Sequence, residues 1–286
     1  MSPDVKTAAR RATRQAHDLY ARATEKQRTL PTFLIIGGQR CGTTTLFKAL
    51  DQHPGVLGAN LRKGVHYFDL HYDRPLSWYR SHFPTQRRVQ ALNRANGYAP
   101  ALGESSPYYL WHPLAVERIA KDLPDIRLIA LLRDPVERAY SAHAHERARG
   151  FESKPFEQAL ESETERLAGE EQRILDDPTA RSTSHQHLAY VRRGEYIEQL
   201  ERVEKLIGRE RLLVLDSQDF WSQPELVWPE VTAFLSLPEA PVQFERHNSR
   251  SRSPMPDELR LRLAAHYEPF DDRLATWWGR TPSWRR

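Results

Sequence analysis

The sequence is poor in cysteine and in long apolar runs. Cys41 is the single cysteine among 286 residues, which excludes an internal disulfide framework and a cysteine-based metal site. The same scarcity predicts a reducing, cytoplasmic location. No stretch approaches the roughly 18 apolar residues that span a bilayer, and residues 1–30 lack the apolar core of a secretion signal. We therefore expect no transmembrane segment.

Lysine is also scarce, since only seven of the 42 basic residues are lysine and the rest are arginine. The arginine fork suits bidentate contacts with phosphate and sulfate, although genome composition accounts for most of the bias. The net charge is only +4, and no basic stripe is concentrated outside residues 1–30, which argues against a nucleic-acid partner. A hydrophobic fraction of 39% at this length predicts a folded domain with a substantial core.

The most informative segment is FLIIGGQRCGTTTLFKAL, residues 33–50. An apolar strand pattern runs into a glycine-threonine turn and then into a helix, which is the layout of a phosphate-binding loop. Gly37, Gly42 and Thr44 fit the template G-x-x-x-x-G-K-[ST], but Thr43 stands in the lysine position. Without that lysine the loop suits one terminal phosphate better than a triphosphate.

A second segment has a similar layout. Residues 126–132 (IRLIALL) form another apolar strand pattern, which stops at Arg133 before a helical stretch. Arg133 would lie at the carboxyl end of a strand, where open α/β sheets bind ligands. Ser141 follows about two helical turns later and could offer a hydroxyl to the same anion. Alternatively, Arg133 pairs with a nearby carboxylate and Ser141 is a surface residue.

Together the two segments resemble the sulfotransferases that use 3′-phosphoadenosine 5′-phosphosulfate (PAPS), with a pattern similar to the heparan-sulfate-type and bacterial enzymes. The likeness extends to GESSPYYLWHP (103–113), RRGEYIEQLERV (192–203) and YEPFDDRLATWWG (267–279). It implies a three-layer, P-loop-like α/β fold with a mainly parallel central sheet flanked by helices. It also implies that Arg133 and Ser141 hold the 3′-phosphate. The residues implied to hold the 5′-phosphosulfate are Gln39, Arg40, Cys41, Gly42, Thr43, Thr44 and Thr45; the family usually has lysine where Arg40 stands.

The resemblance also suggests catalytic residues in LRKGVHYFDLHY (61–72), a segment that we predict to be a strand or an edge loop. In the glycan-modifying branch a glutamate, taken as the catalytic base, follows the lysine that matches Lys63. Here Gly64 stands in its place. His66 then becomes the leading base, since an imidazole with a pKa near 6.5 is largely available at neutral pH and Asp69 could orient it. A structural hydrogen-bonding role for His66 is the alternative.

Other candidates have weaker support. Glu104 is the second candidate base, with a structural role as its alternative. Lys63 could approach the bridging or leaving oxygen, or be a solvated lysine. Ser105 and Ser106 could line an acceptor site or cap the turn before Pro107. No metal site is expected.

The chain divides into a helical lead-in at residues 1–30 and a single domain at 31–286. Within the domain, 150–187 is polar and acidic and is predicted to be an exposed helical insertion or lid. We also expect helices at 196–207 and 225–235, a strand within 211–220, and a loop at 248–254 that returns to the nucleotide.

The expected function is transfer of sulfate from PAPS to a hydroxyl of a carbohydrate or glycoconjugate, leaving adenosine 3′,5′-bisphosphate. The first alternative is a P-loop kinase or NTPase. The second is a nucleotide-binding relative that has lost catalysis, which Gly64 motivates. The oligomeric state is not readable from the sequence.

Overall fold

The computed structural model describes residues 20, 21, 23–60, 62–245 and 253–286. The helical lead-in predicted over 1–30 lies largely outside these residues, as does most of the loop predicted at 248–254. At the centre is a five-stranded sheet in the order β2-β3-β1-β4-β5 with every neighbouring pair parallel. The strands are β1 (Phe33–Gly37), β2 (Val56–Gly58), β3 (Ala101–Ser105), β4 (Arg127–Leu132) and β5 (Leu212–Asp216).

These segments form strands because they are short apolar runs that the fold buries from both faces. Every residue of β1, β3 and β5 is buried, which is typical of a parallel sheet covered by helices. The strands predicted at 33–36 and 126–132 are confirmed as β1 and β4. The strand predicted within 211–220 is confirmed as β5.

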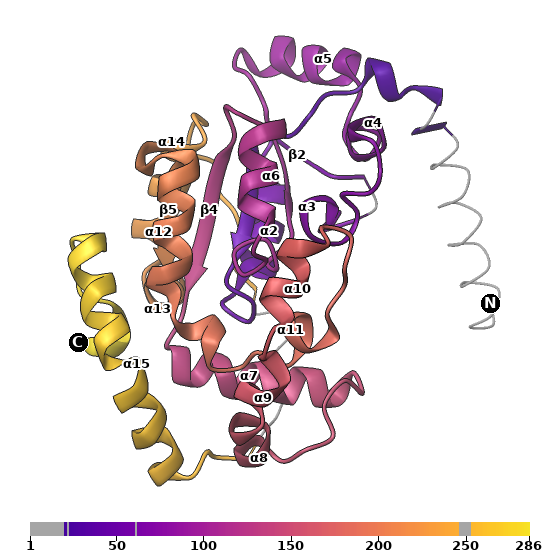
Figure 1. Ribbon diagram of the computed structural model, residues 1–286. Helices are drawn as coiled ribbons and strands as arrows, with labels where there is room; N and C mark the ends of the chain where they lie inside the picture. Colours follow the sequence, from indigo (N-terminus) through magenta and orange to yellow (C-terminus); the bar gives the residue numbers. More distant parts are fainter. Residues whose placement is uncertain (1–19, 22, 61, 246–252) are drawn as a thin grey trace, which may run out of the picture.

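Helices cover both faces of the sheet (Figure 1). The connection from β1 to β2 runs in one direction along the sheet, and the connections from β3 to β4 and from β4 to β5 run in the opposite direction. Because such crossovers are right-handed, the helices of the first connection lie on one face of the sheet and those of the other two lie on the opposite face. Accordingly α6 (Ala115–Asp122) packs against α12 (Tyr196–Ile207) on one face. On the other face, His53, which directly follows α2 (Thr43–Gln52), lies beside α14 (Pro224–Phe234), with its ring 6.3 Å from that of Trp228. The three-layer α/β architecture is therefore as predicted.

The direction of the crossovers reverses at β1, and ligands of open α/β sheets bind at such a switch point. The loop after β1 and the turn after β4 meet there. Figure 1 shows the carboxyl end of β4 pointing toward α7 (Pro135–Ala148), which lies beneath that edge of the sheet.

The other helices with bounds in the described part of the chain are α3 (Tyr67–Leu70), α4 (Leu76–Arg80), α5 (Gln86–Asn96), α8 (Phe156–Glu161), α9 (Glu163–Leu167), α10 (Glu170–Asp176), α11 (Thr183–His187), α13 (Ser217–Ser222) and α15 (Asp257–Trp278), with 3-10 turns η1 (Glu25–Gln27), η2 (Arg192–Gly194), η3 (Arg209–Arg211) and η4 (Ser283–Arg285).

Two expectations differ from the structure. The segment predicted as a strand or edge loop forms a loop up to His66 and then the short helix α3, because Tyr67 and Phe68 turn inward to join the aromatic core. The insertion at 150–187 is helical as predicted, but it is only partly exposed. The carboxylate of Glu163 is buried and accepts backbone N–H bonds from Tyr190, Val191 and Arg192, which ties α9 to the turn before α12.

Candidate functional site

A cavity of about 700 Å³ opens at the switch point, bounded by the loop after β1, the start of α7, and segments from α11 to the C-terminus. One face of α7 lines it at intervals of one turn, with Glu137, Ser141 and His145 in sequence. The lining residues are Gln39, Arg40, Gly42, Thr43, Thr44, Lys63, His66, Pro107, Tyr108, Arg133, Asp134, Glu137, Ser141, His145, Arg149, Gln186, His187, Arg193, Ser217, Gln218, Trp221, Ser283 and Trp284.

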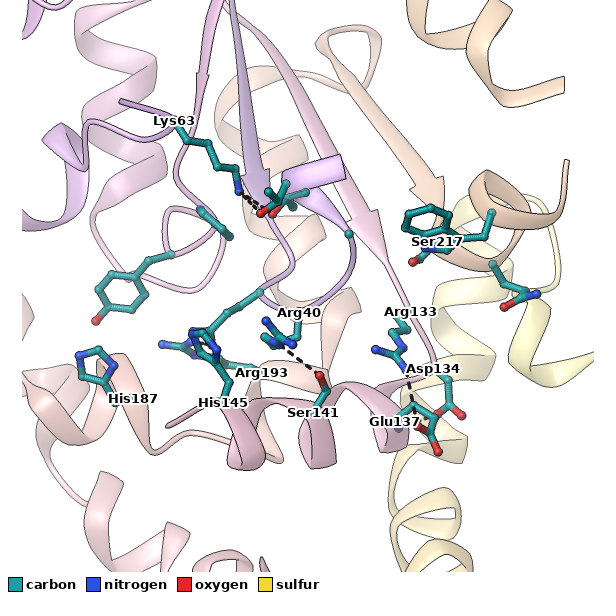
Figure 2. A pocket seen from close by; sticks show the side chains of 18 of the residues that line it. Arg40, Lys63, Arg133, Asp134, Glu137, Ser141, His145, His187, Arg193 and Ser217 are labelled. Atoms are coloured by element: carbon teal, nitrogen blue, oxygen red, sulfur yellow. Dashed lines mark hydrogen bonds and ion pairs between the residues drawn. The ribbon is translucent and has the colours of Figure 1, made fainter. Parts of the chain in front are cut away.

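Two cations lie at the loop after β1, one from the loop itself and one from a different segment. Lys63 Nζ donates to the hydroxyls of Thr43 and Thr44 at 3.2 and 2.9 Å, so an ammonium from another segment lies beside the loop that lacks its own lysine. Arg40 instead points along the cavity, where its Nε donates to Ser141 Oγ at 3.1 Å (Figure 2). Burial lowers the pKa of Lys63 to about 8, with Glu104 opposing the shift.

The second predicted element is close to the first. Arg133 Nη2 lies 3.5 Å from Glu137 Oε2, and the same carboxylate binds Arg260 at 2.6 Å. Arg133 thus has the carboxylate partner that was the alternative interpretation, and it also lines the cavity. Ser141 is buried and bonded to Arg40, so it is not a surface residue. Asp134 caps α7 by accepting from the N–H of Val136 at 2.9 Å.

The imidazole of His66 lines the cavity, and its Nδ1 lies 2.8 Å from Asp69 Oδ2. Burial alone lowers the pKa of His66, but the carboxylates of Asp69 and Glu104 outweigh this and leave the pKa above its ordinary value. Because an ionised carboxylate only accepts, Nδ1 carries the proton and Nε2 is the basic nitrogen. His66 also has a left-handed backbone, with φ of 56°, which is uncommon outside glycine and concentrates at functional sites.

Six of the candidate residues do not line the cavity. Asp69 is buried behind His66. Cys41 is fully buried with its Sγ 3.6 Å from the hydroxyl of Tyr196, and burial raises the pKa of the thiol. Thr45 Oγ1 donates to the carbonyl of Glu245. Glu104 is fully buried beneath the Lys63–His66 loop, where Val65 N, Ser106 Oγ and Tyr109 OH donate to its carboxylate. Ser105 and Ser106 are buried as well.

Residues 30–254 match the family model described as the sulfotransferase domain. The chain belongs to the sulfotransferase family. It is 24% identical to the membrane-associated sulfotransferase kil1 of Dictyostelium discoideum, over 90% of this chain and 67% of that protein. It is 28% identical to the human heparan sulfate glucosamine 3-O-sulfotransferase 5, over 78% of this chain and 58% of that one.

The sulfotransferase is also 28% identical to the bifunctional heparan sulfate N-deacetylase/N-sulfotransferase 4 of Mus musculus, of which the match spans only 22%. Among solved structures, the sulfotransferase of Alicyclobacillus acidocaldarius superposes with a TM-score of 0.63 at 28% identity, over 90% of this chain and all of that one. None of the helices described in our structure is apolar over a length that would cross a membrane.

The cavity also includes basic residues that were not predicted from the sequence. Buried Glu146 accepts from Gln39 Nε2 at 3.2 Å, from Arg149 at 3.2 Å and from His187 Nδ1 at 3.1 Å. Figure 2 shows His187 at the far end of the cavity from Ser217. Arg193 is also buried and donates to Gln39. Burial lowers the pKa of Arg193 to about 10. The helical spacing after Ser141 points to His145. Arg193 lies in the segment RRGEYIEQLERV, which resembles the family, but the spacing of that segment does not place Arg193 at the cavity.

Gly64 has a structural reason to be glycine in this chain. A Cβ at position 64 would lie 2.5 Å from the carbonyl oxygen of Ser105 and 2.9 Å from Ser106 Oγ. The first contact is with backbone, so the Ser105 carbonyl cannot move aside without a shift of β3. The loop therefore passes too close to β3 for a side chain at position 64, including the glutamate that the family resemblance would place there.

Gly64→Glu is accordingly expected to destabilise the protein by about 1–3 kcal/mol and to leave kcat lower than in the wild type, because the side chain forces the loop away from β3. Urea unfolding and initial rates measure both effects. Arg62→Gln is the matched control, since it also changes the charge of the same loop by one negative unit and Arg62 does not line the cavity. A stable Gly64→Glu variant with raised kcat would contradict the steric argument.

Proposed function

We propose that this sulfotransferase transfers the sulfuryl group of PAPS to a hydroxyl of a carbohydrate or glycoconjugate, in line and without a metal, and releases adenosine 3′,5′-bisphosphate. The proposal is supported mainly by two groups of basic and hydroxyl side chains in one cavity, each of which suits an anion. Lys63 with Thr43 and Thr44 forms the first, and Arg133 with Ser141 forms the second. A nucleotide with phosphate groups at both its 5′ and 3′ positions suits that pair.

In the proposed reaction the acceptor oxygen attacks sulfur while the bond from sulfur to the 5′-phosphate oxygen breaks. The acceptor proton passes to Nε2 of His66, whose other nitrogen is held by Asp69. Lys63 and the loop, with Gln39, Gly42, Thr43 and Thr44 facing the cavity, stabilise the charge that develops on the leaving phosphate. Arg40 belongs to the loop and donates to Ser141, so its charge adds to the loop and to the second anion site. Cys41 and Thr45 act through the loop backbone.

The acceptor class rests on two observations. The human and mouse relatives are named for heparan sulfate. The cavity lining also includes the ring of Tyr108, a surface for a sugar, and the basic groups of His145, Arg149 and His187, which suit a polar or anionic acceptor. A cytoplasmic location and a single domain over 31–286 remain predictions.

The kinase or NTPase alternative loses its support, because family membership and Thr43 in the lysine position both favour sulfuryl transfer. The relative without catalysis is still motivated by Gly64. Transfer of labelled sulfate from PAPS to a panel of glycans tests the proposal. Binding of adenosine 3′,5′-bisphosphate with no transfer to any member would favour the second alternative.

Arg133→Ala is expected to weaken adenosine 3′,5′-bisphosphate binding by about 10- to 100-fold, because charge-assisted contacts with the 3′-phosphate are lost. Adenosine 5′-phosphosulfate, which lacks that phosphate, should lose much less affinity. Isothermal titration calorimetry measures both ligands. Arg260→Ala is the matched control, since Arg260 shares the Glu137 carboxylate but does not line the cavity. Equal losses for the two ligands would remove Arg133 from the 3′-phosphate role.

A further inference from the structure

The cavity has walls that lie beyond the stretch matched by the sulfotransferase family model. That stretch ends at residue 254, whereas Ser283 and Trp284 of η4 line the cavity together with Ser217, Gln218 and Trp221 of α13. The C-terminal segment thus returns to the nucleotide end of the site after the whole of α15. Figure 2 shows Ser217 on the same side of the cavity as Arg133 and far from His187.

Buried carboxylates hold this C-terminal segment in place. Asp216, at the end of β5, accepts from Ser283 N at 2.8 Å and from Ser283 Oγ at 2.9 Å, in addition to capping α13. Asp271 of α15 accepts from Trp284 Nε1 at 3.0 Å. Arg286 binds Asp219 at 2.8 Å. The indole of Trp284 is therefore fixed from two elements, and its position does not depend on a flexible tail.

Two indoles lie next to the two anion sites. Trp221 is beside the loop, because its Nε1 is 3.8 Å from where a Cβ of Gly42 would stand. Trp284 packs edge-on against Tyr196 with ring centroids 6.3 Å apart, and the Tyr196 hydroxyl donates to the carbonyl of Arg133. A nucleoside whose phosphates reach the loop and Arg133 must place its base against a nearby wall, and this wall is the aromatic one.

We propose that the C-terminal segment 281–286 is part of the donor site and that Trp284 stacks on the purine base; the inference rests on the proposed function. Base-aromatic stacking tolerates any base but requires a ring, and an alanine in place of the ring typically costs about tenfold or more in affinity. Donor binding then depends on the hydrogen bonds that hold the C-terminal segment to Asp216 and Asp271.

The test compares two ligands on three proteins by isothermal titration calorimetry. The ligands are adenosine 3′,5′-bisphosphate and ribose 3,5-bisphosphate, which has the same phosphates but no base. We expect Trp284→Ala to lower the affinity for adenosine 3′,5′-bisphosphate by about tenfold or more, and the affinity for the abasic ligand by less than about twofold. Trp284→Phe keeps a ring and loses only the bond to Asp271, so it should stay within about threefold of the wild type for both. Trp278→Ala, in α15 and outside the cavity lining, is the matched control.

Each outcome bears on the inference. Equal weakening of both ligands in Trp284→Ala would mean that the ring only seats the C-terminus, and would overturn the stacking role. Unchanged binding of the adenosine ligand by a folded Trp284→Ala variant would overturn this inference alone. A wild-type protein that binds no adenosine 3′,5′-bisphosphate would overturn the proposed function, and this inference with it.

Discussion

Replacing His66 with alanine is expected to lower kcat by about 10²–10⁴ while leaving the affinity for adenosine 3′,5′-bisphosphate almost unchanged. The reason is geometric. His66 lines the cavity with its Nδ1 held by Asp69, and in the proposed reaction the leaving phosphate is bound by Lys63 and the loop threonines and not by His66. Steady-state rates with saturating PAPS, together with calorimetry of the product nucleotide, measure the two quantities.

The pH profile provides a second measurement of the same role. A base must be deprotonated to accept a proton, and Asp69 holds the pKa of His66 above 6.5, so kcat/KM of the wild type should rise as pH increases through that raised value. It should fall again near pH 8, where Lys63 loses its charge. Asp69→Asn removes the carboxylate, which lowers the pKa of His66 and moves the acidic limb to lower pH.

His71→Ala is the control for both measurements. His71 lies in the same segment, at the end of α3, but it does not line the cavity, and its substitution should leave kcat and the pH profile near those of the wild type. If His66→Ala kept the acidic limb at full rate, the base would have to be another group or the acceptor itself.

The parts of the structure that could be predicted from the sequence are those set by local chemistry. The strand, glycine turn and helix at residues 33–50 follow from apolar runs and permissive backbone, and the layout is the one observed. Arg133 and Ser141 could be placed on the same cavity because a strand end and a helical period of two turns fix where they point. Such signals need no knowledge of distant segments.

The features that could not be predicted depend on contacts between segments that are far apart in the chain. Lys63 reaches the loop hydroxyls from twenty residues away, and Trp284 reaches the cavity from the end of the chain. Neither pairing leaves a periodic trace in the sequence. The short helix at Tyr67 was missed because tertiary burial of its aromatic ring outweighed the alternating pattern. Gly64 could be noticed, but the approach of Ser105 that excludes a side chain there could not.

A large loss of stability is expected from Glu104→Ala, because the carboxylate is the shared acceptor for the loop that carries His66. Val65 N, Ser106 Oγ and Tyr109 OH donate to it at 3.1, 2.6 and 2.7 Å, and Ser106 Oγ in turn accepts from His66 N at 3.1 Å. Removing the acceptor leaves several buried donors without a partner, each costing about 1–3 kcal/mol. The expected decrease in unfolding free energy is about 3 kcal/mol or more.

Urea unfolding measures this decrease, and Glu117→Ala, at an exposed position on α6, should change stability by less than about 0.5 kcal/mol. Glu104→Gln separates the structural role from the catalytic alternative, since the amide keeps the shape and one acceptor oxygen. If His66 is the base, Glu104→Gln should lower the rate because the loop that carries His66 shifts, and the fall of kcat/KM at acidic pH should remain. Burial raises the pKa of Glu104, so a catalytic Glu104 would itself supply that limb, and its disappearance in Glu104→Gln would transfer the base role from His66 to Glu104.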